Sequence, residues 1–236
     1  MRSAMAVFKK QARDTLKNRM VLMQFIIFPV MALIMTQLVA KANNDIPDNI
    51  FVTMFAAMFA GMTPLTMTAS AIAEDKEKKS LRFLIMAGVK PHEYIIGVGG
   101  FVLFASAVVA VLFALIGGFG VIGFIMFVAV LLLGSAASLL LGGIFGMISR
   151  NQQSAVAMAM PVAMIFAFLP MLAQFDGDIK GVANILFSQQ VNEIVSNDIA
   201  AGSAGSIAGP LLIILANIVV FLVLFTVAYR KKGLKG

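Results

Sequence analysis

The residue types that usually carry enzyme chemistry are scarce in this chain of 236 residues. It has no cysteine and a single histidine, His92. Thiol catalysis, iron–sulfur clusters and every site that needs two imidazoles are therefore excluded, and no metal site is expected. The sequence contains neither a G-x-x-x-x-G-K-[ST] phosphate loop nor a G-x-S-x-G nucleophile elbow. We therefore expect no catalytic residue and no nucleotide-binding site in this chain.

One literal nucleotide-binding pattern does occur, at residues 118–123, where Gly-Phe-Gly-Val-Ile-Gly matches G-x-G-x-x-G. The dinucleotide fingerprint requires a preceding strand and an acidic residue about 20 positions later. Here the pattern joins two apolar runs, and no acidic residue lies between Glu93 and Asp176. We therefore interpret it as a glycine hairpin.

The densest group of chemically active side chains lies in residues 74–93. Glu74 precedes Lys78 and Asp75 precedes Lys79 by four positions, which is the favourable order for helical ion pairs. Leucine and isoleucine side chains then recur on one face, which predicts a short charged helix with an apolar stripe. The residues that we select as a candidate contact site are Glu74, Asp75, Glu77, Ser80, Leu81, Leu84 and Ile85.

The elements that must position this segment are apolar runs of membrane-spanning length. Hydrophobic residues form 61% of the chain and charged residues 12%, which excludes a soluble enzyme and a disordered chain. A spanning helix needs about 20 apolar residues. Six runs without Asp, Glu, Lys or Arg meet this requirement: residues 20–40, 50–73, 94–117, 119–148, 154–173 and 210–228. The predicted fold is therefore an all-α polytopic membrane protein with one transmembrane domain, residues 1–236.

The basic residues are divided unequally between the two sides of this topology. Sixteen of the 18 lie before the first run, between the second and third, between the fourth and fifth, or after the sixth. Only Lys41 and Lys180 lie on the other side. The positive-inside rule then places both termini in the cytoplasm of a cell with an inner (plasma) membrane. The net charge of +7 is thus explained by topology and does not indicate nucleic-acid binding.

Two further segments are not spans. Residues 1–19 carry Met5, Phe8, Ala12 and Leu16 on one helical face and basic residues elsewhere, which predicts an interfacial amphipathic helix in contact with lipid. Residues 174–209 are too polar to span and form an external segment. We expect them to re-enter the outer leaflet or to cap a pathway.

Two patterns within the runs suggest roles in packing and transport. Small residues recur every four positions at Gly134, Ser138, Gly142 and Gly146, a spacing that allows close helix approach. Flexible apolar side chains recur at Met160, Met164, Phe168 and Met171. This second set is a candidate lining for a pathway, although ordinary lipid-facing or core packing explains the same pattern.

The whole arrangement resembles the membrane subunits of ABC exporters of the type-two permease group. The likeness is strongest around residues 72–81, Ile-Ala-Glu-Asp-Lys-Glu-Lys-Lys-Ser-Leu. The positions that match the pattern of the family are Asp75, Lys76, Glu77, Ser80, Leu81, Leu84, Val89, Glu93 and Gly97. Lys79, Gly88 and Val98 depart from it.

The resemblance implies a half-transporter that exports a hydrophobic or amphipathic substrate, such as a drug, an antimicrobial peptide or a lipid-like molecule. Two permease subunits, identical or related, would pair and bind separate ATPase subunits that hold ATP and Mg²⁺. Residues 74–93 would then be the cytoplasmic coupling helix between spans two and three. The alternative is an ATP-independent channel-forming or accessory membrane protein. An ion-coupled carrier is disfavoured because the runs contain no ionisable residue.

Overall fold

The structure is a computed structural model that describes residues 2–42, 47, 49–174, 177–200 and 207–232. Within these ranges the chain is helical and contains no strand. The helices are α1 (Arg2–Lys17), α2 (Arg19–Met35), η1 (Thr36–Ala40), α3 (Ile50–Glu77), α4 (Ser80–Met86), α5 (Pro91–Gly117), α6 (Val121–Ile148), α7 (Gln152–Leu172), α8 (Gly177–Ala183), α9 (Phe187–Glu193), η2 (Ile194–Ala200) and α10 (Ala208–Lys232).

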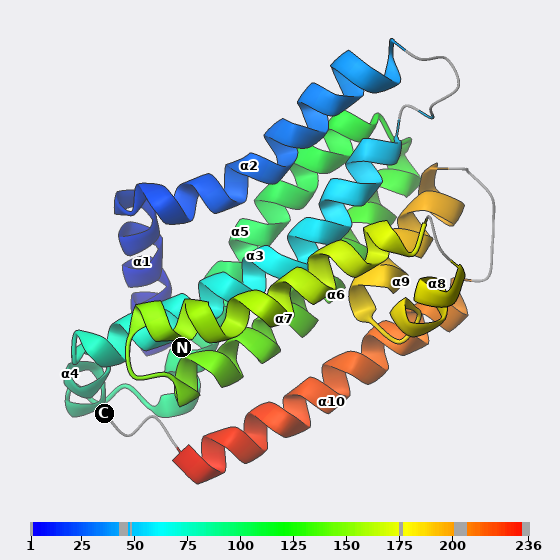
Figure 1. Ribbon diagram of the computed structural model, residues 1–236. Coiled ribbons are helices and arrows are strands. Elements are labelled where there is room, and N and C mark those ends of the chain that lie inside the picture. Colours follow the sequence, from blue (N-terminus) through cyan, green and yellow to red (C-terminus); the bar gives the residue numbers. More distant parts are fainter. Residues whose placement is uncertain (1, 43–46, 48, 175–176, 201–206, 233–236) are drawn as a thin grey trace.

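Six of these elements are long and apolar enough to cross a bilayer, which confirms the predicted number of spans. They are α2 with the π-helical turn η1, then α3, α5, α6, α7 and α10. Figure 1 shows them running side by side between an end that carries α4 and an end that carries α8 and α9. Several boundaries differ from the expected ones by up to four residues. Helix α3 continues four residues beyond residue 73, to Glu77, and α5 begins at Pro91.

Helix α3 is the centre of the bundle and is mostly buried between α6 and α7. The small-residue stripe on α6 faces it. A Cβ atom at Gly142 would lie 2.2 Å from the Leu65 carbonyl oxygen, and one at Gly146 would lie 2.8 Å from the Ile72 Cβ. Only residues without a side chain permit this approach, so these glycines set the distance between α3 and α6.

Two prolines free backbone carbonyls at close contacts between helices. Pro64 has no N–H group and therefore frees the carbonyl of Ala60, four residues earlier. Ser138 of α6 donates its hydroxyl hydrogen bond to that carbonyl. Pro170 frees the carbonyl of Phe166 in the same way, and a Cβ at Gly61 would lie 2.6 Å from this oxygen. The prolines thus occur where neighbouring helices approach the freed carbonyls.

The Gly142→Val substitution is expected to destabilise the bundle by about 1–3 kcal/mol or more, because the added atoms collide with the backbone of α3. The matched control is Gly100→Ala in the middle of α5, where the added Cβ would meet only a Phe8 ring atom at 3.9 Å. Thermal unfolding of both variants in lipid nanodiscs checks this. An unfolding temperature for Gly142→Val equal to that of the control contradicts the packing.

Helix α1 lies against α5 at the α4 end of the bundle. Val7 is buried against Gly97, and the Phe8 ring packs edge-on against Phe101 with centroids 5.6 Å apart. Of the four residues expected on its apolar face, Phe8 and Ala12 pack against the core, whereas Met5 and Leu16 are more than half exposed. The predicted apolar face is therefore divided between the bundle and the outer surface, and its contact with lipid stays a prediction.

The segment that follows α7 folds back into the bundle. Helix α9 contacts α3, α6, α7 and α10, and its residues from Phe187 to Asn192 are all buried. The Phe187 ring stacks on Phe166 with a centroid distance of 4.8 Å. In the described part of residues 174–209, α9 thus packs among the spanning helices; whether the segment re-enters the outer leaflet or caps a pathway stays a prediction.

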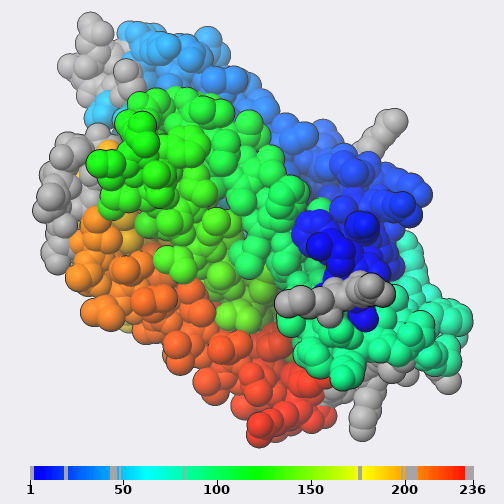
Figure 2. All heavy atoms as spheres, turned by 180° about the vertical axis from the view of Figure 1, so that it is seen from behind, coloured from blue at the N-terminus to red at the C-terminus, as the bar shows by residue number. Residues whose placement is uncertain are grey.

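The outer surface of the bundle is largely apolar. Figure 2 shows α10, coloured orange to red, along one edge of the rear face, with α5 and α6 in green beside it. Leu212, Val219 and Val223 of α10 are each more than half exposed. Such a surface is suited to contact with lipid chains.

Candidate functional site

Asp75, in the last turn of α3, is the centre of a buried polar cluster. Its side chain is almost fully buried and forms an ion pair with Lys10 of α1. It also accepts hydrogen bonds from the Ser80 hydroxyl of α4 at 2.7 Å and from the Tyr94 hydroxyl of α5 at 2.9 Å. One carboxylate therefore joins four helices.

The Lys10 ammonium remains charged in this cluster. Burial lowers its pKa, but the hydrogen bond and charge of Asp75, with a smaller contribution from Asp14 at 3.1 Å, raise it by more, so the net pKa lies above 10.5. Because the folded-state pKa is the higher one, the stability that the Lys10 ammonium contributes is lost as the pH rises through this raised pKa. Lys10 therefore keeps its charge throughout the physiological range.

Lys76 binds the end of a different helix. Its ammonium donates to the carbonyl oxygens of Met147 and Ser149, each at 2.7 Å. These carbonyls lie where α6 ends and have no partner within that helix. A cation is stabilised at a helix C-terminus by the helix dipole as well as by hydrogen bonds.

Glu77 binds the beginning of the next helix. Its carboxylate accepts from the backbone N–H of Gln152 at 3.0 Å, in the first turn of α7. The Asn151 side chain caps the same turn by accepting from the Ser154 N–H at 2.8 Å. The Gln152 side chain then donates to the Ser70 hydroxyl of α3 at 2.8 Å. An anion at a helix N-terminus is the favourable arrangement.

Three consecutive residues therefore fix the ends of several helices. Asp75 holds α1, α4 and α5, while Lys76 and Glu77 hold the junction between α6 and α7. Of the two expected ion pairs within α3, the one between Glu74 and Lys78 is present. The expected pairing of Asp75 with Lys79 is wrong. Asp75 binds Lys10 instead, because α3 ends at Glu77 and Lys79 has a positive φ of 56°.

Helix α4 buries part of the stripe that was expected to face another protein. Leu81 is 1% exposed and packs with Tyr94 and Met147, and Leu84 packs against the same cluster. The prediction that Leu81 offers its side chain to a partner is therefore wrong, because this chain already covers it. The side chain of Ile85 lies outside the described residues.

The opposite face of α4 is the exposed one. Phe83 and Met86 are each 66% exposed. Figure 1 shows α4 at the extremity of the bundle, beyond the ends of the spanning helices. Among the described side chains of α4, these two are the large apolar groups that are left uncovered.

A hollow of about 540 Å³ lies between α2, α3 and α7, toward the α4 end. Polar side chains and apolar ones alternate on its walls: Asn18, Val21, Gln24, Thr66, Met67, Ser70, Gln152, Gln153, Val156, Ala157 and Met160. Of the methionine and phenylalanine set predicted to line a pathway, Met160 lies in this hollow. Met164 and Phe168 are exposed farther along α7, and Met171 is half-buried.

Three members of the polar cluster were not selected from the sequence. In the sequence, Lys10 stands out only as a topology-setting charge, Lys76 as such a charge and as a position that matches the family pattern, and Tyr94 as part of a span. The available signal for Tyr94 was its rarity, since the chain has only two tyrosines. A further signal for a role of Tyr94 in the polar cluster is its position at the start of a span, 19 residues after Asp75.

The fold and this site define a polytopic helical membrane protein whose spans are joined by a polar cluster at one end. Residues 3–227 match the ABC-2 family transporter protein family. The chain therefore belongs to this family, which identifies it as a membrane subunit of a transporter rather than as a catalytic subunit. No curated protein matches the chain closely enough to count as a relative.

Proposed function

We propose that this chain is the permease subunit of an ATP-driven exporter, powered by ATPase subunits that bind ATP and Mg²⁺. Family membership supports this proposal, because ABC-2 permeases in general work with a separate ATPase. A second permease subunit, identical or related, would complete the pathway. The observation that carries the proposal is the Asp75–Lys76–Glu77 cluster, since it connects the protruding helix α4 with α1, α3, α5, α6 and α7.

The α4 end is then the cytoplasmic side of a plasma membrane. Sixteen of 18 basic residues lie in the segments that belong to this end, in agreement with the positive-inside rule. An ATPase closing beneath the membrane would push on α4. The rigid cluster would pass this movement to the spans that border the hollow.

The substrate that we propose is hydrophobic or amphipathic. The hollow beside α3 and α7 combines amide and hydroxyl groups with methionine and valine side chains. Such a lining can solvate both parts of an amphipathic molecule. None of its described lining residues has an ionised side chain, so a small inorganic ion is a poor fit.

Phe83→Asp is expected to weaken assembly with the ATPase subunit by at least about tenfold, because burying a large apolar side chain contributes roughly 1.5–3 kcal/mol. The control is Lys79→Asp, which introduces the same carboxylate at an exposed position in the same loop. Leu81→Asp is unsuitable because it would disrupt the core of this chain. Co-purification from native membranes, with the ATPase activity of the bound subunit measured, checks this expectation.

Equal assembly of the Phe83→Asp and Lys79→Asp variants would show that α4 is not the contact. If the unmodified chain brings down no ATP-hydrolysing subunit and still conducts solutes in liposomes, the ATP-independent channel is the correct interpretation.

A further inference from the structure

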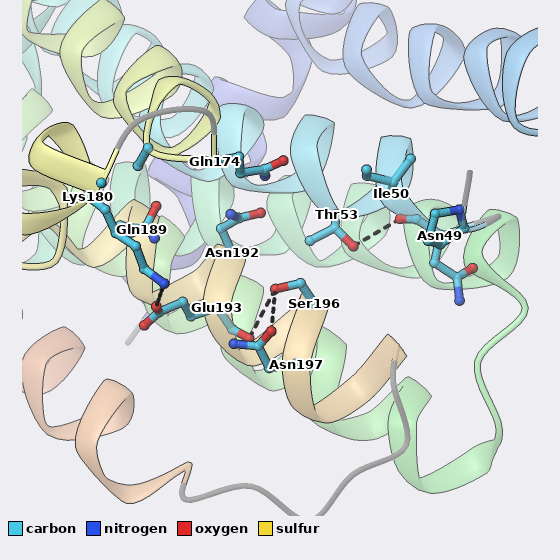
Figure 3. A pocket seen from close by; sticks show the side chains of 13 residues that line it. Asn49, Ile50, Thr53, Gln174, Lys180, Gln189, Asn192, Glu193, Ser196 and Asn197 are labelled. Atoms are coloured by element: carbon cyan, nitrogen blue, oxygen red, sulfur yellow. Dashed lines mark hydrogen bonds and ion pairs between the residues drawn. The ribbon is translucent and has the colours of Figure 1, made fainter. Parts of the chain in front are cut away.

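A second cavity, of about 520 Å³, lies at the end of the bundle opposite α4. It is bounded by the beginning of α3, the end of α7, and α8, α9 and η2 (Figure 3). Its lining residues are Pro47, Asn49, Ile50, Thr53, Ala173, Gln174, Gly177, Lys180, Gln189, Asn192, Glu193, Ser196 and Asn197. The volume is typical of a site for a small molecule.

Amide side chains dominate the lining of this cavity, and two of them bury a carbonyl oxygen without a hydrogen-bond partner. Gln189 and Asn192 of α9 are 3% and 4% exposed, and their carbonyl oxygens have no hydrogen-bond partner in the structure. Figure 3 shows the amides of Asn192 and Gln174 facing the same space from α9 and from the end of α7. Buried polar atoms without partners are uncommon in proteins. Both oxygens have almost no accessible surface, so a ligand that supplies donors would satisfy them once the two amides turn toward the cavity.

The charges of the described lining residues of this cavity cancel. Lys180 and Glu193 are the charged side chains among its described lining residues, and they pair with each other at 3.4 Å. The remaining polar groups are amides and hydroxyls, which both donate and accept hydrogen bonds. Their complement is a neutral group with several hydroxyls, since a hydroxyl also donates and accepts.

We propose that this cavity binds a neutral polyhydroxyl group, either a free sugar or the sugar headgroup of a glycolipid. Gln189 and Asn192 accept hydrogen bonds from its hydroxyls. Ile50 and Ala173 contact its C–H faces. The inference is independent of the proposed function, because binding is measured without an ATPase partner and without transport.

The test uses the full chain, purified in a detergent without a sugar headgroup and placed in phosphatidylcholine nanodiscs. Maltose is titrated by calorimetry, and thermal unfolding is compared in nanodiscs with and without glucosyl diacylglycerol. We expect saturable binding of one of these probes, and little or no binding of choline or inorganic phosphate. Binding of maltose identifies a free sugar as sufficient, whereas stabilisation by the glycolipid alone identifies a lipid headgroup. Both results support the proposal.

Asn192→Leu and Gln189→Met should each weaken this binding about tenfold, because each removes a hydrogen bond to the ligand while nearly preserving side-chain volume. Neither should lower the unfolding temperature, since the carbonyls that are removed have no partner in the protein. The control is Ser188→Ala, whose hydroxyl on the same helix is equally buried and unpartnered but does not line the cavity. The proposal is overturned if neither sugar probe binds, if choline or phosphate binds more tightly, or if both substituted amides leave the affinity unchanged.

Discussion

Asp75→Ala is expected to be the most damaging single substitution at the α4 end of the bundle. It removes the acceptor for Ser80 and Tyr94 and leaves the Lys10 ammonium without its main partner. Removing one member of a buried ion pair costs roughly 3–5 kcal/mol. Because Lys10 is partly exposed, we expect a loss near the lower limit, about 3 kcal/mol of unfolding free energy.

The matched control is Glu74→Ala, one residue earlier on the same helix. Its ion pair with Lys78 is largely exposed, so its removal should cost only about 0–1 kcal/mol. Asp75→Asn retains an acceptor for one hydroxyl and should fall between the two. Measuring the unfolding free energy of the three variants in nanodiscs tests this order of stability.

A double-mutant cycle separates the ion pair from the two hydroxyl contacts. In the Lys10→Met background, Asp75→Ala should cost measurably less than in the unmodified chain, because no ammonium is left unpaired. If Asp75→Ala unfolds at the temperature of the unmodified chain, or if the cycle shows strict additivity, the buried cluster does not hold α1 in place.

The six spans could be predicted because they depend only on length and apolar composition. The end of α3 could not be placed in the same way. The charged residues after residue 73 predict a separate short helix within residues 74–93, whereas in the structure α3 itself continues to Glu77 and a second helix begins at Ser80. What stabilises this extra turn is the set of partners on α1, α5, α6 and α7, and these partners are distant in sequence.

The orientation of α4 was unpredictable for a related reason. Its seven residues have large apolar side chains on both faces, with Leu81 and Leu84 on one and Phe83 and Met86 on the other. Periodicity cannot decide which pair turns inward. The hydrogen bond from Ser80 to Asp75 fixes the rotation of the helix, and it turns Leu81 toward the core.

The polar cavity at the end opposite α4 was also not predictable from the sequence. The sequence predicts that residues 174–209 are too polar to span. It did not indicate that Gln189, Gln190 and Asn192 are all buried. Their burial follows from Phe187, which packs on Phe166 and draws α9 into the bundle. From sequence alone, amide side chains predict an exposed segment. Their burial here depends on a tertiary contact between two aromatic side chains, which the sequence does not reveal.

Exchanging the charges of Lys76 and Glu77 is expected to damage the protein even though the net charge is unchanged. An ordinary ion pair survives reversal of both members. Lys76 and Glu77 instead bind helix ends whose polarity is fixed by the backbone: carbonyl oxygens at the end of α6 and an N–H group at the beginning of α7. In the Lys76→Glu/Glu77→Lys variant, an anion faces carbonyls and a cation faces an N–H group.

Each single reversal should cost about 2 kcal/mol, because a hydrogen bond to a charged group is lost and the helix dipole then opposes the new charge. The double reversal should cost about the sum of the two rather than recover. The control is the double reversal Glu74→Lys/Lys78→Glu, which re-forms an exposed pair between side chains and should leave the unfolding free energy nearly unchanged. Hydrogen exchange at residues 147–154 should accelerate only in the Lys76→Glu/Glu77→Lys variant. In that variant the α6–α7 junction loses its hydrogen bonds to both side chains. Recovery of the Lys76→Glu/Glu77→Lys variant to the stability of the control would mean that these residues pair with side chains, and that the α6–α7 junction is held by some other contact.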